Sequence, residues 1–414
     1  MAEGNQNSPP PGRRGRGGGP AFLKRKRGWG VTLALCLCLS ANGQKSLYNL
    51  KFTLSEKNFV DTIAVEWTDR HLFVPVEIGG KTYRFLFDSG ASQTSLYDDT
   101  PFLADCETVG FTVSHDAVAH RDTVQKVQLP PITLGQLTLT GCQATVVHRA
   151  VRRNYDGIIG FDIVNKGLAM KIDVQAGHII LTDRHKLMAA EPGFTARYRL
   201  DHFTPAVELT PFGTFREYAL FDTGFPGFYT MNRESFDRGT EKSSETLGKQ
   251  IEGRAMGRWA LGHGGAEQRS EVVFLALDSL LLGGFAFCDL HALTTQGDSK
   301  LGAQLLERGA VVFLPKRKRL CFQPYNGEAR LVVGNRQTEK VVVPDKGRPV
   351  IGLVWERSEA FAEGLREGDV IEKVNGRAIT SMADYYRFGP ATGLPVKLGV
   401  RDKRGFQKTI SITW

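Results

Sequence analysis

Cysteine is scarce in this 414-residue sequence, and the cysteines outside the amino-terminal segment are not spaced to bind a metal. The six are Cys36, Cys38, Cys106, Cys142, Cys288 and Cys321. Zinc sites place pairs of Cys or His a few residues apart, whereas the last four cysteines are far apart in sequence, so we expect no metal. Those four allow three disulfide pairings, and free buried thiols are equally compatible with the sequence.

Long apolar runs and sustained 3.6-residue periodicity are also scarce. Apolar stretches are short, rich in Val, Ile, Leu and Phe, and interrupted by 46 Gly and 18 Pro, which favours a mainly β fold. A hydrophobic content of 41% is enough for a buried core in each of two or three domains. Short helices are expected at residues 162–168, 303–307, 360–364 and 382–388.

Most of the positive charge lies at the amino terminus. Residues 1–43 carry seven Lys or Arg and one acid, so the rest of the chain is near neutral. The basic residues 24–27, the apolar run 31–39 and the small residues Ala41-Asn42-Gly43 predict a secretory signal peptide over 1–43. We therefore expect an exported protein, periplasmic or extracellular, with no stable membrane span after cleavage. An uncleaved tether is the alternative, although the apolar run is short for a bilayer.

The same segment offers a second interpretation. Residues 13–17 are rich in Gly and Arg, as in some RNA-binding tails. An extended basic region in front of a signal peptide explains them more simply, and so we expect no nucleic-acid partner.

An acidic turn occurs twice in the chain, with matching surroundings. Asp88-Ser89-Gly90 follows the apolar run 85–87, and Asp222-Thr223-Gly224 follows the apolar run 219–221. A strand-like alternation precedes each turn, and an apolar-Gly element follows at a similar distance, ending at Gly160 and at Gly302. One such triplet arises by chance in about one chain in five of this length. Two copies with matched flanks predict the duplication of a whole lobe.

These paired features resemble the aspartic proteases, in both their two-lobed pepsin-like and their dimeric retropepsin-like forms, over roughly residues 60 to 326. The resemblance implies a catalytic dyad of Asp88 and Asp222. It further implies turns that need Gly90 and Gly224, hydrogen bonds from Ser89 and Thr223, and support from the strands ending at Gly160 and Gly302. Two adjacent carboxyls that share one proton can activate water without a covalent intermediate or a cofactor. The expected substrates are proteins or peptides.

One residue departs from the family pattern. After the turn Gly the family usually has Ala, Ser or Thr; Ala91 conforms, but the second lobe has Phe225. A phenyl ring cannot donate a hydroxyl hydrogen bond to a carboxylate. Two alternatives therefore stay open: an inactive, protease-like peptide-binding or scaffolding protein, and a homodimer that uses Asp88 from two chains.

Two β-hairpins are expected to hold the substrate. In the first lobe, residues 110–114 and 124–129 alternate around a polar tip at 115–122. In the second lobe, residues 254–268 occupy the equivalent place; their glycines lack the GxxxxGK[ST] pattern of a phosphate loop. His115 and His120 at the first tip suggest a metal, but without a nearby Cys or Glu cluster we interpret them as solvated loop residues.

The sequence changes character after residue 326. The run EGLREGDVIEKVNG, residues 363–376, combines a short helix ended by Gly, a turn, a strand and an Asn-Gly hairpin turn. It resembles a PDZ domain of the kind appended to bacterial exported proteases. The resemblance implies that the strand from Val350 captures an extended peptide or a free C-terminus, beside a loop at 346–349. The implied residues are Gly347, Ile351, Gly352 and Leu353. The alternative is a small domain that packs on the protease and binds nothing.

The expected organisation is therefore mainly β. A signal peptide (1–43) precedes two duplicated aspartic-protease β-barrel-like lobes (44–190 and 191–326) and a small C-terminal PDZ domain (327–414).

Overall fold

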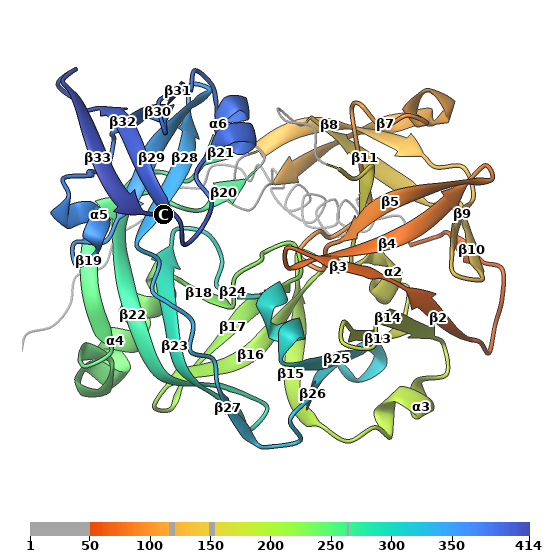
Figure 1. Cartoon of the computed structure of the whole chain (residues 1–414). Helices are drawn as coiled ribbons and strands as arrows, with labels where there is room; N and C mark the ends of the chain where they lie inside the picture. The colour runs from red at the N-terminus through yellow and green to blue at the C-terminus, as the bar shows by residue number, and fades with distance from the viewer. Residues whose placement is uncertain (1–49, 116–120, 149–153, 263–264) are drawn as a thin grey trace, which may run out of the picture. The chain divides into compact units, whose positions relative to one another are not determined.

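The computed structural model of the protein describes residues 50–115, 121–148, 154–262 and 265–414 (Figure 1). The predicted signal peptide lies outside these residues. The fold is mainly β, which confirms the fold class expected from the sequence. In the part of the chain that the structure describes, no helix combines the length and the apolarity that a membrane crossing requires.

The first lobe is built on an 11-stranded sheet. Its central strands lie in the order β4-β5-β12-β6-β11-β8-β7, and β1, β9, β10 and β3 extend it at the β4 side. The central strands are β4 His71–Ile78, β5 Lys81–Phe87, β6 Ser95–Tyr97, β7 Glu107–His115, β8 Arg121–Gln128, β11 Gln143–Val147 and β12 Gly157–Ile159. The others are β1 Thr53–Leu54, β3 Glu66–Thr68, β9 Ile132–Leu134 and β10 Leu137–Thr140.

The second lobe repeats this order within a 14-stranded sheet, as β16-β17-β24-β18-β23-β22-β19. The matching strands are β16 Thr204–Phe212, β17 Phe215–Asp222, β18 Tyr229–Asn232, β19 Ile251–Gly257, β22 Ser270–Leu282, β23 Phe285–Thr295 and β24 Lys300–Gly302. The directions match as well: β5 pairs parallel with β12, as β17 does with β24, and β6 pairs parallel with β11, as β18 does with β23. The strand topology is therefore duplicated.

The two lobes share strands across the expected sequence boundary at residue 190. The 14-stranded sheet continues from β16 through β15, β26, β25, β13 and β14 to β2, and β27 (Arg330–Val332) pairs with β23. The strands are β2 Val60–Ala64, β13 Ala169–Asp173, β14 His178–Thr182, β15 Phe194–Asp201, β25 Gly309–Leu314 and β26 Arg319–Pro324. Because β13 pairs with β25, strands from both halves of the chain form one sheet.

The buried side chains follow the same plan. One hydrophobic core contains residues from both lobes, and Phe313 of β25 lies at its centre. The ring of Phe313 packs edge-on against Phe161 of the first lobe, with centroids 5.0 Å apart, and at 5.6 Å from Phe221 of the second. Phe161 follows β12 and Phe221 lies in β17, so burial of these rings ties the supporting strand of the first lobe and the strand before the second acidic turn to a common core.

The short helices form close to where the sequence predicts them. They are α2 Asp162–Asn165, a 3-10 helix at Ala303–Glu307, α5 Glu359–Ala362 and α6 Met382–Phe388. The sequence analysis missed α3 (His185–Ala189) and the 16-residue α4 (Arg233–Gly248). In α4 only Phe236 and Leu247 are apolar and buried, so no 3.6-residue pattern of apolar residues indicates the helix. Its start is set by Asn232, whose side chain accepts the Ser235 N–H.

The C-terminal residues form a six-stranded sheet with its own hydrophobic core. Its strands are β28 Lys340–Asp345, β29 Arg348–Val354, β30 Val370–Val374, β31 Arg377–Ala378, β32 Pro395–Arg401 and β33 Gln407–Thr413. This C-terminal domain packs on the second lobe through a small apolar cluster. The cluster joins Val272, Phe274, Leu293, Ala255 and Trp259 to Val341, Leu353 and Trp355. Figure 1 draws the blue C-terminal strands beside the green β19 and β22.

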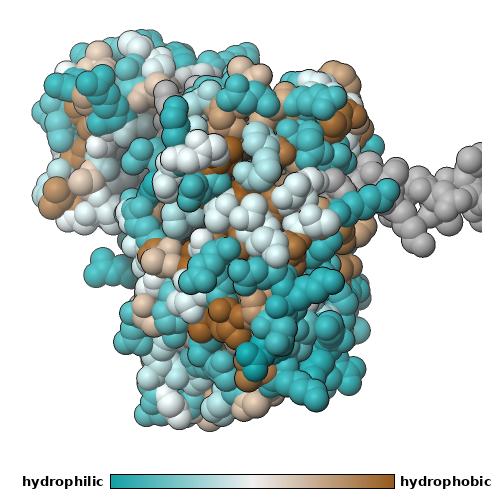
Figure 2. All heavy atoms as spheres, turned by 90° about the vertical axis from the view of Figure 1, so that its right-hand side faces the viewer, coloured by the Kyte–Doolittle hydropathy of each residue, from teal (hydrophilic) through white to brown (hydrophobic). Residues whose placement is uncertain are grey.

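The face at the right of Figure 1 is mostly hydrophilic, with apolar residues in small patches (Figure 2). The four cysteines of the described chain, Cys106, Cys142, Cys288 and Cys321, are all free thiols.

Candidate active site

Each acidic turn begins where a buried strand ends. The N–H of Asp88 donates to the carbonyl of Ile159 on β12 (2.9 Å), and the N–H of Ala91 donates back to the carbonyl of Asp88 (3.2 Å). In the second lobe the N–H of Phe225 donates to the carbonyl of Asp222, also at 3.2 Å. Equivalent backbone bonds therefore place both aspartates at equivalent points of the two sheets.

Ser89 and Thr223 bind the two turns to one another by exchanging hydrogen bonds. The N–H of Ser89 donates to Thr223 Oγ1 (2.9 Å), and the N–H of Thr223 donates to Ser89 Oγ (3.1 Å). Each hydroxyl then donates across the lobe boundary, Ser89 Oγ to the carbonyl of Phe221 (2.6 Å) and Thr223 Oγ1 to the carbonyl of Phe87 (2.8 Å). Both side chains are fully buried, so these four bonds fix the separation of the two turns.

The two carboxyl groups come together over the turn glycines. A Cβ built on Gly90 would lie 2.6 Å from Asp222 Cγ, and one built on Gly224 would lie 2.7 Å from Asp88 Cγ. Neither position can hold a larger residue without displacing the opposite carboxyl. The N–H of Gly90 donates to Asp88 Oδ1 (2.8 Å) and the N–H of Gly224 to Asp222 Oδ1 (2.9 Å). The structure thus brings together all six residues of the two triplets.

Gly160 and Gly302 lie directly beneath the turns. A Cβ on Gly160 would lie 2.4 Å from the backbone of Gln93, and one on Gly302 would lie 2.2 Å from the carbonyl oxygen of Gly227. Both contacts are with backbone, which cannot move aside cheaply. The supporting strands can approach the loops after each triplet this closely only because these two positions lack a side chain.

Phe225 still contributes one hydrogen bond to the site, through its backbone. Its N–H donates to Asp222 Oδ1 at 3.1 Å. Its ring packs over the loop and the supporting strand, where a Cβ on Gly227 or Gly302 would meet it at 2.4 and 2.6 Å. The ring of Phe225 therefore fills the space beside the turn but donates no hydrogen bond. The backbone N–H groups of Gly224 and Phe225 both donate to Asp222 Oδ1, so the donor to Oδ2 comes from another part of the chain.

That donor is Lys300, which the sequence analysis missed. Its ammonium lies 2.8 Å from Asp222 Oδ2, and its side chain is only 15% exposed. The sequence shows a charged residue, Lys300, directly before Leu301-Gly302. At the equivalent position before Ile159-Gly160, the first lobe has an apolar residue, Ile158. A lone lysine beside a short apolar element is ordinarily solvated, so the sequence alone gave no reason to place it at the dyad.

The pKa values of the two carboxyls shift in opposite directions. Burial, reinforced by the negative charge of Asp222, raises the pKa of Asp88 to about 7. Burial alone would also raise the pKa of Asp222, but the charge of Lys300 and its hydrogen bond outweigh burial and lower that pKa below its usual value of 3.8. Burial and Lys300 therefore separate the pKa values of the two carboxyls, with that of Asp88 raised and that of Asp222 lowered.

The expected hairpins are present in both lobes. β7 and β8 pair antiparallel, and the tip between them, which includes His120, lies outside the described residues. β19 and β22 form the equivalent hairpin, and the short strands β20 (Leu261–Gly262) and β21 (Gly265–Ala266) belong to its tip. Among the residues that the structure describes, no three His, Cys, Asp or Glu side chains are grouped to hold a metal ion.

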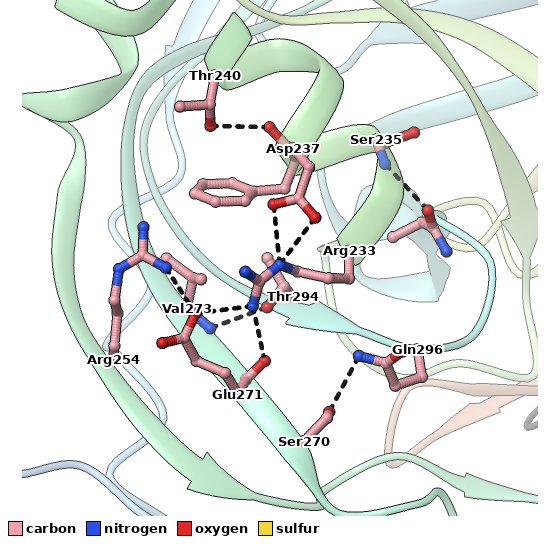
Figure 3. Close-up of polar contacts among 12 residues, drawn as sticks. Arg233, Ser235, Asp237, Thr240, Arg254, Ser270, Glu271, Val273, Thr294 and Gln296 are labelled. Carbon is pink, nitrogen blue, oxygen red and sulfur yellow. Dashed lines mark hydrogen bonds and ion pairs between the residues drawn. The ribbon is translucent and has the colours of Figure 1, made fainter.

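The second-lobe hairpin is held by an ionic network near the tip end of its paired strands, shown in Figure 3. Arg233 at the start of α4 donates to Glu271 Oε2 (2.8 Å) and to Asp237 (3.0 Å). Arg254 on β19 donates to the same Glu271 oxygen at 2.6 Å. In contrast, β7 of the first-lobe hairpin exposes Phe111, which is 72% accessible. The two hairpins therefore differ in their side chains: the second-lobe hairpin is ion-paired to α4, and the first-lobe hairpin exposes an aromatic ring.

The predicted peptide-binding strand of the C-terminal domain is β29 (Arg348–Val354), and peptide binding there stays a prediction. β29, which carries Ile351, Gly352 and Leu353, lies inside the sheet between β28 and β30. At the irregularity in its pairing with β28, the carbonyl of Gly352 accepts the N–H of Arg258 from the second lobe (2.8 Å). Gly347 forms the turn between β28 and β29, and its carbonyl accepts the N–H of Met382 (2.7 Å). β29 pairs with β30 only at Val350, and Ile351 bonds to Asp369 and Gly368, so strand addition along the rest of this edge stays a prediction.

Comparison with known proteins supports a protease relationship for the first lobe. Residues 74–163, which contain Asp88 and Gly160, match the family model described as aspartyl protease. Among solved structures, the aspartic proteinase from Irpex lacteus is similar at 14% sequence identity, over 64% of this chain and 97% of that chain, with a TM-score of 0.38. No match to a curated protein was found.

Proposed function

We propose that the protein is an aspartic endopeptidase whose catalytic pair is Asp88 and Asp222. One observation carries this proposal: two carboxyls at topologically equivalent strand ends converge, and each lies against the turn glycine of the other. A strand-ending turn needs neither the convergence nor the buried hydrogen-bond exchange between Ser89 and Thr223. The family match of the first lobe agrees with this function.

The proposed hydrolysis needs only the two carboxyls, a water molecule and a peptide bond. The ionised carboxylate takes a proton from water as the water oxygen bonds to the peptide carbonyl carbon, and the protonated carboxyl gives its proton to the carbonyl oxygen. The tetrahedral adduct then collapses as the C–N bond breaks. The amine nitrogen takes the proton gained from water, and a hydroxyl proton of the adduct returns to the carboxyl that first donated. Both carboxyls end in their starting states.

The substrates on this proposal are extended peptides or unfolded proteins. The first-lobe hairpin is the better candidate for closing over them, because Val109, Phe111 and Val113 of β7 leave an apolar row exposed. Export is proposed from the basic and apolar segment at residues 24–39. Fractionation of cells that produce the full chain, with amino-terminal sequencing of the mature protein, tests the export step.

Cleavage of an unstructured protein by purified residues 44–414 tests the proposed activity. We expect new peptide termini from the wild type at acidic to neutral pH, and none from the Asp88→Asn/Asp222→Asn double variant. Asp278→Asn, which changes an exposed aspartate of the second lobe, is the matched control and should cleave normally. Equal cleavage by wild type and double variant would trace the activity to a contaminant and end the proposal.

The second candidate is a peptide-binding protein without catalysis, and Phe225 is the observation that favours it. A peptide captured by the C-terminal domain would add to a strand edge of its sheet, either along β29 beyond Val350 or at β28, one of the outer strands. Wild type that binds an unstructured peptide but never cleaves it would support this candidate against the protease.

A further inference from the structure

The two lobes differ at two positions beside their acidic turns. The strand pairings place Ile158 of β12 and Lys300 of β24 at equivalent positions, each two residues before the supporting Gly. In the first lobe Ile158 is buried in an apolar cluster against which Ala91 packs. In the second lobe the corresponding pair is Lys300 and Phe225. The second lobe thus has a bulky residue and a buried cation beside its aspartate, where the first lobe has a small residue and an apolar one.

A buried ammonium is costly unless a carboxylate and hydrogen bonds compensate for its lost hydration. Lys300 has that compensation in Asp222, at 2.8 Å, and its Nζ lies 5.9 Å from the centre of the Phe225 ring. Phe225 has no hydroxyl to offer Asp222, and Lys300 donates to the carboxylate oxygen that the backbone N–H groups leave open. The two differences between the lobes therefore compensate one another.

We propose that Lys300 is a positioning residue that keeps Asp222 ionised and so leaves the shared proton on Asp88. The inference rests on the proposed function, in which the two carboxyls would otherwise be interchangeable. With Lys300 in place their roles are fixed. Asp222 takes the proton from water, and Asp88 donates to the carbonyl oxygen of the substrate.

The charges around the pair agree with this assignment. Asp88, Asp222 and Asp298 are the carboxyls whose charges act on Lys300, and together they raise its pKa although burial opposes this. The other buried carboxyl on β17, Glu217, accepts hydrogen bonds from Tyr229 and from Ser299. With the proton on Asp88, the charges of Asp222 and Lys300 cancel, so the dyad and its lysine are neutral. A buried site is most stable in that state.

Titration of the aspartate carboxyls by carbon-13 NMR tests the assignment directly and does not require activity. Signals of Asp88 and Asp222 are assigned by their loss in Asp88→Asn and Asp222→Asn. In the wild type, Asp222 should stay ionised below the usual aspartate range and Asp88 should titrate near neutrality. Lys300→Met removes the cation but keeps the chain length, and the Asp222 transition should then rise by about 1–3 pH units.

The matched control is Lys408→Met in the C-terminal domain. Lys408 lies 2.7 Å from the buried carboxylate of Asp369, so this variant also breaks a lysine–aspartate pair but leaves the dyad alone. Its dyad titration should equal that of the wild type. An Asp222 transition that is unchanged in Lys300→Met, or a proton found on Asp222 in the wild type, would overturn the inference.

Kinetics separate this inference from the proposed function. The acid limb of kcat/KM should move to higher pH by the same 1–3 units in Lys300→Met, and the alkaline limb should also move up, because losing a cation makes both carboxyls easier to protonate. A wild type that titrates as expected but cleaves nothing would refute the protease proposal and support the proton assignment. A Lys300→Met enzyme with an unchanged pH profile would refute the assignment and keep the protease.

A double variant covers the case in which Lys300→Met fails to fold. Lys300→Ile with Phe225→Thr gives the second lobe the apolar residue of the first and restores a hydroxyl beside Asp222. We expect this variant to fold and cleave, with its acid limb shifted to higher pH relative to the wild type. The wild-type pH profile in this double variant would show that the lysine does not set the charge of Asp222.

Discussion

At the scale of single residues, the site depends on a few buried atoms that have no substitute. Ser89 and Thr223 each satisfy one backbone N–H and one backbone carbonyl of the opposite turn. A buried polar group that loses its partner costs about 1–3 kcal/mol, far more than the net gain from making the bond. The exchange between the turns therefore stabilises the fold and aligns the carboxyls at once.

Replacing Thr223 with Val tests this exchange. Val matches the shape of Thr but leaves the Ser89 N–H and the Phe87 carbonyl without a partner. The free energy of unfolding should fall by about 2–4 kcal/mol, measured by chemical denaturation, and activity should fall with it. Thr223→Ser keeps the hydroxyl and is the matched control. A stable Thr223→Val beside a destabilised Thr223→Ser would mean that packing of the methyl group, and not the hydrogen bonds, matters at this position.

The raised pKa of Asp88 predicts a pH-dependent stability. Between its ordinary value of 3.8 and its folded value of about 7, Asp88 is protonated only in the folded protein. Folding then takes up a proton, so its contribution to stability is lost as pH rises through that range. Asp88→Asn removes the effect. The melting temperature should fall more steeply from pH 5 to pH 8 in the wild type than in Asp88→Asn; parallel curves would contradict the raised pKa.

The sequence predicted the pair Asp88 and Asp222 because a repeated triplet with repeated flanks can be recognised without knowledge of the structure. It did not predict Lys300, because the partner of a lysine depends on which strand lies across the sheet, and that is set by tertiary structure. The sequence showed that Phe225 departs from the family pattern. It did not show that Lys300 lies beside Asp222, because this depends on the parallel pairing of β24 with β17.

At the scale of secondary-structure elements, each aspartate is positioned by three strands. The strand that ends at the triplet pairs parallel with the strand that ends at the supporting Gly, and a third strand pairs with the latter. This arrangement requires backbone-to-backbone contact beneath the turn, which only Gly allows at positions 160 and 302.

Gly302→Ala tests the element-level support. The new Cβ would lie 2.2 Å from the carbonyl oxygen of Gly227, so the loop after Asp222 must move. We expect a loss of about 1–3 kcal/mol in stability from overpacking and a fall in kcat larger than the change in KM. Gly248→Ala at the end of α4, where a Cβ meets nothing within 4 Å, is the matched control. Unchanged kcat in Gly302→Ala would separate this strand from catalysis.

We predict that packing of Trp355 stabilises the second-lobe hairpin against the C-terminal domain. Its ring stacks on Phe274 of β22, with centroids 5.9 Å apart, and a Cβ on Gly253 of β19 would lie 3.1 Å from its indole nitrogen. Trp355→Ala should cost about 2–4 kcal/mol and speed hydrogen exchange in β19 and β22 but not in β7 and β8. Tyr386→Ala, an exposed aromatic of the same domain, should leave both hairpins unchanged. Faster exchange in all four strands would indicate global loosening instead.

Elements with strong local signals were predicted well, and those without were not. The hairpins and the short helices follow from alternation, Gly turns and caps. Helix α4 was missed because its buried face has two apolar residues, and the pattern of β29 does not show which edges of the strand are paired. The pairing of β29 with β28 and, at Val350, with β30 depends on tertiary structure.

At the scale of the whole molecule, one chain supplies both halves of the site. Strands β13 and β14 of the first half of the chain and β25 of the second lie in one sheet, and both triplets rest on one core. The sequence boundary at residue 190 does not show the strand pairing that crosses it. A homodimer that uses Asp88 twice is therefore unnecessary.

The most direct test of this account compares the cleavage rates of wild type, Asp88→Asn, Asp222→Asn and an equal mixture of the two variants, with the molecular mass measured by light scattering. If Asp88 and Asp222 of one chain form the catalytic pair, each variant is inactive, the mixture stays inactive, and the wild type cleaves as a monomer. Full activity of Asp222→Asn, or activity that appears only in a dimer, would contradict the single-chain dyad.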